Sequence, residues 1–287
     1  MQIRYAIAWA MVAIQSTDAS NSTSKGDLNG WYPCSEYTFS DEGSSTGQVA
    51  QCAVYSAPLC YPGICETPPG VNSEVDVFVK RLPATAADPA TTTNVWLLQG
   101  GPVEISMATL HSELEGTVNV YTMDHRGTGR STKPDCVAAQ VTTTGSPWDL
   151  QIKYGDLASF SVTTAATDLA TFISRFTNGA GTIVYGLDPH TPNKYAEYLL
   201  NALRGEKKEL IAFEYATHGT VMTTPMVADN PWSETCGMKV LASYVRVGGD
   251  LERLDKSCVA EMPAFNLTTP DYYLYSYFGT DDAYDGV

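Results

Sequence analysis

Short apolar runs that end in glycine-containing or polar turns recur through the middle of the chain. Residues 74–82 alternate apolar and polar side chains, which is typical of a half-buried strand. Uninterrupted apolar runs predict buried strands at 94–98 and 117–123. A segment of about helix length separates these two runs, and the pattern therefore favours parallel strands that are joined by crossovers.

The pattern continues with helical spacing further along the chain. Apolar residues at a period of about 3.6 predict an amphipathic helix at 161–176. Short apolar runs predict strands at 182–185 and 209–215. A second helix is expected at 192–204, because it begins at a proline and is followed by a glycine. A right-handed crossover would then place the strands at 182–185 and 209–215 in parallel.

The N-terminal residues predict an export signal. Arg4 provides a short positive region, and residues 5–14 form an apolar run that is too short to span a bilayer. Small residues follow, so we expect cleavage near Ala19 and a secreted mature chain. The alternative interpretation of the apolar run is a buried N-terminal helix or strand.

Seven cysteines agree with export, since none has zinc-finger spacing with histidines. The first four are expected to pair among themselves, and Cys236 is expected to pair with Cys258. Cys136 is then left without a partner. The cysteines are Cys34, Cys52, Cys60, Cys65, Cys136, Cys236 and Cys258.

Composition narrows the possible partners. The 287 residues are 44% hydrophobic, which is enough for a substantial core. Seventeen Lys and Arg residues against 32 Asp and Glu residues give a formal charge of −15. Nucleic acid and anionic membrane surfaces are therefore unfavourable partners. No metal-ligand cluster is evident among the four histidines, and no cofactor is implied.

Four turns carry the candidate chemistry, and each lies next to a predicted strand. In their order along the chain they resemble secreted serine peptidases of the tripeptidyl-aminopeptidase and prolyl-iminopeptidase-like family, over roughly residues 74–262. The resemblance implies an α/β-hydrolase fold, with a mostly parallel sheet and helices on both faces. The turns are Gln99-Gly100-Gly101-Pro102, Asp124-His125-Arg126-Gly127-Thr128-Gly129-Arg130-Ser131, Leu187-Asp188-Pro189-His190-Thr191-Pro192 and Thr217-His218-Gly219.

The same resemblance implies residue roles and a peptide substrate. Gly100 and Gly101 correspond to the oxyanion-hole loop, where small residues let backbone N–H groups approach a developing negative charge. The family usually has a further glycine where this chain has Val103. Asp188 corresponds to the acid of the catalytic triad and His218 to its base. The segment 124–131 is expected to be a structural loop, with Asp124 and Arg126 in salt bridges or hydrogen bonds, rather than a local triad.

The nucleophile of that family is missing. It should lie on a Gly-x-Ser-x-Gly turn directly after the strand at 182–185, but Gly186 leads straight into Leu187-Asp188. The expected fold is therefore internally truncated, and loss of a triad serine costs on the order of a millionfold in kcat. A formal match at Gly43-Ser44-Ser45-Thr46-Gly47 has no preceding strand, so we do not assign it as the nucleophile.

The resulting organisation has four parts: a signal peptide at 1–19, a disulfide-rich region at 20–73, a truncated core at 74–229 and a C-terminal segment at 230–287. The primary hypothesis is an aminopeptidase-like hydrolase by family that is inactive in this form. Three alternatives stay open: a secreted binding or decoy protein, an incomplete gene or splice product of an active peptidase, and a hydrolase with another nucleophile.

Overall fold

The computed structural model describes much of the chain, and two compact units emerge from it. One comprises residues 10–187, and the other comprises residues 1–9 with 188–287. The described residues are 5–8, 27–35, 49–98, 103–134, 147–186, 208–213, 216, 219–228, 230, 233–264, 275 and 279–280.

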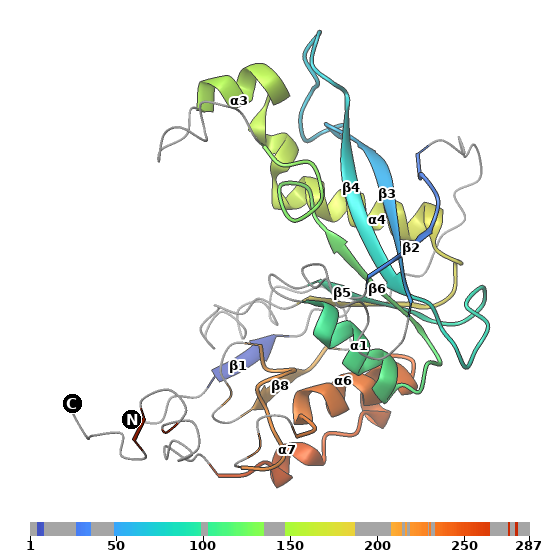
Figure 1. Ribbon diagram of the computed structural model, residues 1–287, viewed down its shortest axis with the longest axis vertical. Coiled ribbons are helices and arrows are strands. Elements are labelled where there is room, and N and C mark those ends of the chain that lie inside the picture. The colour runs from blue at the N-terminus through green and yellow to red at the C-terminus, as the bar shows by residue number, and fades with distance from the viewer. Residues whose placement is uncertain are drawn as a thin grey trace. The chain divides into compact units, whose positions relative to one another are not determined.

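The unit 10–187 is built on a six-stranded sheet with the order β2-β3-β4-β6-β5-β7 (Figure 1). Neighbouring strands are antiparallel from β2 through β6, whereas β5 is parallel to both β6 and β7. The strands are β2 (Tyr32–Cys34), β3 (Ala50–Pro58), β4 (Glu74–Leu82), β5 (Asn94–Leu98), β6 (Asn119–Asp124) and β7 (Thr182–Gly186).

The prediction of a mostly parallel α/β-hydrolase sheet is wrong. Three of the five strand pairs are antiparallel, and only two are parallel. The apolar runs at β5, β6 and β7 were correctly placed, and their pairings are parallel as predicted. The error has two sources: the direction of β4 cannot be seen in its alternation, and β3 was missed. Because β3 consists largely of alanine, serine and cysteine rather than β-branched residues, it gives a weak strand signal.

Two long helices pack on this sheet. Helix α4 (Val162–Phe176) runs behind β3 and β4 in Figure 1, and it matches the predicted helix. Its Phe172 and Ile173 join a core cluster with Trp96 and Tyr121. Val95 and Leu97 alternate with Trp96 and so face the other side of the sheet, where α1 (Val103–Glu113) contacts β5 and β6.

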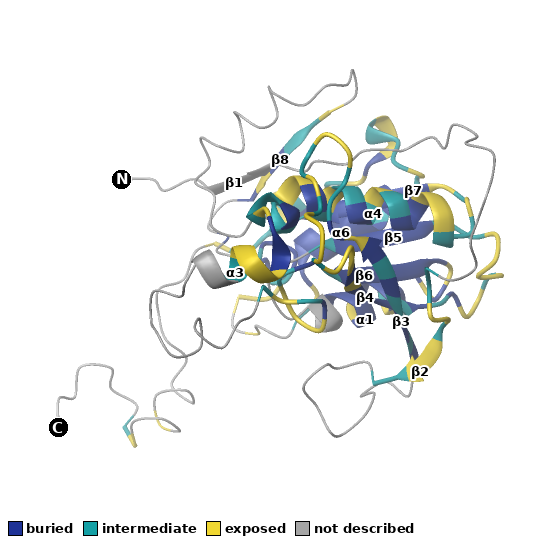
Figure 2. Cartoon of the chain, turned by 90° about the horizontal axis from the view of Figure 1, so that it is seen from above, coloured by how far each residue is buried: buried dark blue, intermediate teal, exposed yellow. Residues whose placement is uncertain are grey.

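Aromatic stacking fills the α4 side of the sheet. The rings of Trp96 and Tyr121 stack with centroids 4.8 Å apart, and Phe172 meets Trp96 edge-on at 5.6 Å. Offset and edge-on ring pairs stabilise a core beyond the area that they bury. Figure 2 shows buried residues concentrated in β4, β5 and β6, between the more exposed turns.

The described part of this unit also contains short elements. Helix α3 (Pro147–Tyr154) and the 3-10 helix η1 (Leu157–Phe160) precede α4. The disulfides Cys34–Cys52 and Cys60–Cys65 form as predicted within the first four cysteines. Cys136 lies outside the described residues.

The second unit contains β1 (Tyr5–Ala8), β8 (Leu210–Phe213), α6 (Cys236–Arg246), η2 (Leu251–Arg253) and α7 (Cys258–Glu261). β8 pairs antiparallel with β1, with Tyr5 opposite Phe213. The expected parallel pairing of this strand with 182–185 is therefore wrong, since β8 is not part of the six-stranded sheet. The expected helix at 192–204 lies outside the described residues.

The Cys236–Cys258 disulfide forms as predicted and joins the starts of α6 and α7. The chain approaches α6 so closely that a Cβ on Gly237 would come within 2.5 Å of the Thr220 carbonyl oxygen. The Gly237 N–H also donates to Thr224 Oγ1 at 2.8 Å. Only glycine fits this contact between the 219–224 turn and the helix.

Candidate functional site

The four residues that the peptidase resemblance implicates are outside the described part of the chain. They are Gly100, Gly101, Asp188 and His218. The described segments end just before two of these turns, because β5 ends at Leu98 and β7 at Gly186. The Gly43–Gly47 match also falls outside the described residues. The catalytic roles assigned to these positions stay predictions.

The loop at 124–131 is described, and it is structural as predicted. The Ser131 hydroxyl donates to the Asp124 carbonyl oxygen and accepts from the Phe78 N–H at 2.8 Å. The Asp124 carboxylate accepts from the Arg130 N–H at 2.9 Å. A Cβ on Gly129 would lie only 2.2 Å from that carboxylate, and its φ of +52° also favours glycine. Ser131 is only 4% exposed, and its hydroxyl stabilises the loop through hydrogen bonds and does not serve as a nucleophile.

Arg126 anchors this loop to three other segments. Its Nε and Nη2 donate to the two Asp168 carboxylate oxygens at 2.6 and 2.5 Å. Its remaining N–H groups donate to backbone carbonyl oxygens of Pro58, Leu59 and Ser159 at 2.8–2.9 Å. All five guanidinium donors are therefore used, which is what a buried arginine requires.

A tyrosine extends the same network toward the Cys60–Cys65 loop. The Tyr61 hydroxyl donates to Asp168 Oδ1 at 2.8 Å. Burial raises the pKa of Tyr61, and the negative charge of Asp168 raises it further. Burial likewise raises the pKa of Tyr55. The Tyr61 hydroxyl therefore keeps its proton and donates it in the hydrogen bond to the Asp168 carboxylate.

Sequence reasoning missed Asp168, although a signal was present. Asp168 lies in α4 four positions before Phe172, on the face that packs against the sheet, and it is completely buried. An acidic residue within the apolar stripe of a helix requires a charged or hydrogen-bonding partner. Arg126 is that partner.

An open cavity of about 250 Å³ lies beside this network, at the carboxyl ends of β5 and β6. We call it the Leu98 cavity. His125, Arg126 and Ser161 are its polar residues. Its apolar residues are Leu98, Met123, Phe160, Val162, Ala165, Ala166 and Leu169.

The polar groups of the Leu98 cavity do not form a nucleophile–base pair. Thr164 Oγ1 donates to the Ala158 carbonyl oxygen at 2.7 Å, so its single hydroxyl proton is used there. The Ser161 hydroxyl, 2.9 Å from Thr164 Oγ1, must therefore be the donor in that contact. Ser161 Oγ also accepts from the Thr164 N–H at 3.2 Å and caps α4. Its proton is directed to Thr164 and not to the exposed His125 ring.

What the cavity can do is accommodate an apolar group. An apolar cavity of about 150 Å³ is enough to bind benzene. The Leu98 cavity is larger, and Val162 on its rim is 87% exposed. A ring-sized or branched aliphatic group would bury this apolar surface without displacing a structural hydrogen bond.

No family model, no curated protein and no solved structure matches this chain at a significant level. The resemblance to serine peptidases, which rests on the four turns, therefore stays a prediction.

Among the described residues no three His, Cys, Asp or Glu side chains are placed to hold a metal ion. Within the same residues no helix is long and apolar enough to cross a membrane. The three disulfides are consistent with an oxidising compartment.

Proposed function

We propose that this chain is an exported, non-catalytic binding protein that takes an apolar side chain of a peptide into the Leu98 cavity. The observation that carries the proposal is the apolar cavity at the ends of β5 and β6, whose one serine hydroxyl is committed to helix capping. The three disulfides and the apolar N-terminal run support export. The peptidase-like turns support a peptide as the ligand.

Two observations support the absence of catalysis. The predicted nucleophile turn is missing from the sequence after residue 186, and Ser131 and Ser161 both have structural hydrogen bonds. A serine activated by a histidine would react with a fluorophosphonate probe. We expect no labelling of the exported chain at any serine. A labelled serine, identified by mass spectrometry, would contradict the non-catalytic assignment.

Binding can be measured directly with N-acetyl-phenylalanine amide as the probe. At about 0.3 kcal/mol for each of its roughly 15 non-hydrogen atoms, the expected Kd is near 1 mM. Titration followed by ¹⁵N–¹H NMR should shift the amide signals of Leu98, Met123 and the first turns of α4. N-acetyl-glycine amide, which lacks an apolar side chain, should give no comparable shifts.

A matched pair of variants tests the location. Ala166 is exposed and lines the cavity, so Ala166→Phe should fill it and weaken binding by about tenfold or more at little cost in stability. Ser174→Phe places the same ring two helical turns further along α4 at an exposed position outside the lining, where the ring cannot cover Ala166. It should leave binding unchanged. Equal effects of the two variants would place the binding site elsewhere.

A further inference from the structure

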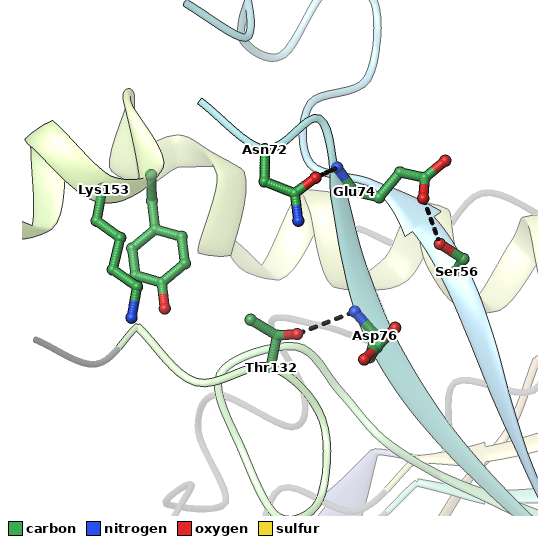
Figure 3. A pocket seen from close by; sticks show the side chains of 7 residues that line it. Ser56, Asn72, Glu74, Asp76, Thr132 and Lys153 are labelled. Atoms are coloured by element: carbon green, nitrogen blue, oxygen red, sulfur yellow. Dashed lines mark hydrogen bonds between the residues drawn. The ribbon is translucent and has the colours of Figure 1, made fainter. Parts of the chain in front are cut away.

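A second cavity, of about 320 Å³, lies between the start of β4 and the end of α3 (Figure 3). We call it the Asp76 pocket. Glu74 and Asp76 are two residues apart on β4, so their side chains share one face of the strand. Ser56 pairs with Asp76 in the β3–β4 register. Figure 3 shows Lys153 on the side opposite to these residues.

Hydrogen bonds hold the β4 side of the pocket in a fixed arrangement. The Ser56 hydroxyl donates to Glu74 Oε2 at 2.9 Å. The Glu74 N–H donates to Asn72 Oδ1 at 3.2 Å, and the Asp76 N–H donates to Thr132 Oγ1 at 2.9 Å. These contacts orient the side chains of Ser56, Glu74, Asn72 and Thr132 without using their full bonding capacity, whereas Asp76 is held through its backbone. Pre-organised polar groups of this kind favour a specific small ligand.

The groups that remain are both donors and acceptors. The Asn72 amide nitrogen has two N–H donors, and its oxygen is the atom that Glu74 uses. The second Glu74 oxygen can accept, and within the described residues the Asp76 carboxylate has no hydrogen-bond partner. The Lys153 ammonium brings a positive charge to the other side of the pocket, where it lies 5.1 Å from the centre of the Tyr154 ring.

This lining selects against anions and against apolar ligands. Two carboxylates in a chain with a formal charge of −15 repel anions. An apolar ligand would remove the carboxylates and the ammonium from water without replacing their hydrogen bonds. A hydroxyl group both donates one hydrogen bond and accepts others, so a polyhydroxylated ligand can bond to the Asn72 amide and to the two carboxylates at the same time.

We propose that the Asp76 pocket binds a single sugar ring. Its volume is at the low end of the range of about 300–1,000 Å³ for small-molecule sites, which fits one ring better than a chain of several. Neighbouring ring hydroxyls donate to the Asp76 and Glu74 carboxylates and accept from the Asn72 amide nitrogen. The site is separate from the Leu98 cavity, since the two share no lining residue, and it does not depend on the function proposed for that cavity.

The test is an NMR titration of the ¹⁵N-labelled full chain with the methyl glycosides of glucose, galactose and mannose. We expect at least one glycoside to shift the amide signals of Asn72, Glu74, Asp76, Thr132 and Lys153 with a millimolar Kd. Asp76→Asn should weaken that binding by about tenfold, because it removes a charge-assisted acceptor. Asp76 is exposed, so the variant should keep the wild-type spectrum elsewhere.

Glu66→Gln is the matched control, since it also replaces one exposed carboxylate by an amide but lies outside the pocket. It should bind the glycoside like the wild type. The proposal is overturned if none of the three glycosides shifts these amides at about 100 mM, which corresponds to negligible affinity. It is also overturned if Glu66→Gln and Asp76→Asn weaken binding equally, or if free glycine or ethylamine shifts these amides and the glycosides do not.

Discussion

Arg126 and Asp168, 42 residues apart in the sequence, form a two-pronged ion pair in which both side chains are completely inaccessible to solvent. The pair ties the loop after β6 to the middle of α4. Backbone carbonyls of Pro58 and Leu59 bring the end of β3 into the same contact. Arg126 therefore joins three segments, two of which, the loop after β6 and α4, line the Leu98 cavity.

Removing one partner of this pair should be strongly destabilising. Asp168→Asn leaves the Arg126 charge buried without its counter-ion, and we expect a loss of about 3–5 kcal/mol in the free energy of unfolding. Asp27→Asn is the matched control, because Asp27 pairs with Arg175 at 2.9 Å with both side chains about 30% exposed. Its cost should be about 1 kcal/mol or less. Urea unfolding of the two variants provides the comparison, and similar midpoints would contradict this account.

Alkaline pH should destabilise the unit 10–187 through its buried tyrosines. Burial raises the pKa of Tyr61, Tyr55 and Tyr185, so their ionised form is disfavoured in the folded state. Their contribution to stability is fully present below the unfolded-state pKa of about 10 and is lost as pH rises above it. Each such group lowers the free energy of unfolding by up to about 1.4 kcal/mol per pH unit.

Tyr61→Phe isolates one of these contributions. The variant should show a shallower decline in stability above about pH 10, while below that pH it loses only its hydrogen bond to Asp168. Tyr32→Phe is the control, because Tyr32 is 41% exposed. Urea unfolding at a series of pH values is the measurement. An unchanged slope for Tyr61→Phe would show that Tyr61 stays accessible to ionisation in the folded chain.

The disulfides should differ in how much they stabilise the chain. Loop-closure entropy predicts about 3 kcal/mol for Cys236–Cys258, with a separation of 22 residues, and about 2 kcal/mol for Cys60–Cys65, with a separation of 5. Paired Cys→Ser replacements and thermal unfolding would measure both contributions to stability.

The Cys60–Cys65 variant should also weaken the hydrogen bond between Tyr61 and Asp168. The pKa of Tyr61 would then be less raised, which a spectrophotometric titration can measure. A larger loss from the Cys60–Cys65 replacement, with the Tyr61 pKa unchanged, would contradict the entropic ranking.

Export makes a prediction for the N-terminus and for β8. Mass spectrometry of material secreted by a host cell should find Cys236 linked to Cys258 and no peptide from before about residue 19. Cleavage there would remove β1, and β8 would lose the strand with which it pairs. Amide hydrogen exchange at Leu210–Phe213 should then be fast. Secreted chains that retain Tyr5–Ala8 and protect β8 would show that the apolar run is a structural strand.

The sequence by itself determined where several elements lie. Alternation located β4, apolar runs located β5, β6 and β7, and helical spacing located α4, because each pattern records which side chains of a segment face water. The expected Cys236–Cys258 bond is also present. The prediction that the Asp124–Ser131 loop is structural is also confirmed.

Only the tertiary structure decided which segments meet. Periodicity carries no information about strand direction or distant partners, so β4 was assigned to a mostly parallel sheet although it pairs antiparallel with both β3 and β6. Periodicity also could not predict the pairing of Arg126 with Asp168. A buried charge requires a partner, but the sequence does not show which residue that partner is. The Leu98 cavity lies between the ends of β5 and β6 and the start of α4. These segments are far apart in the sequence, so only their packing in the folded chain creates the cavity.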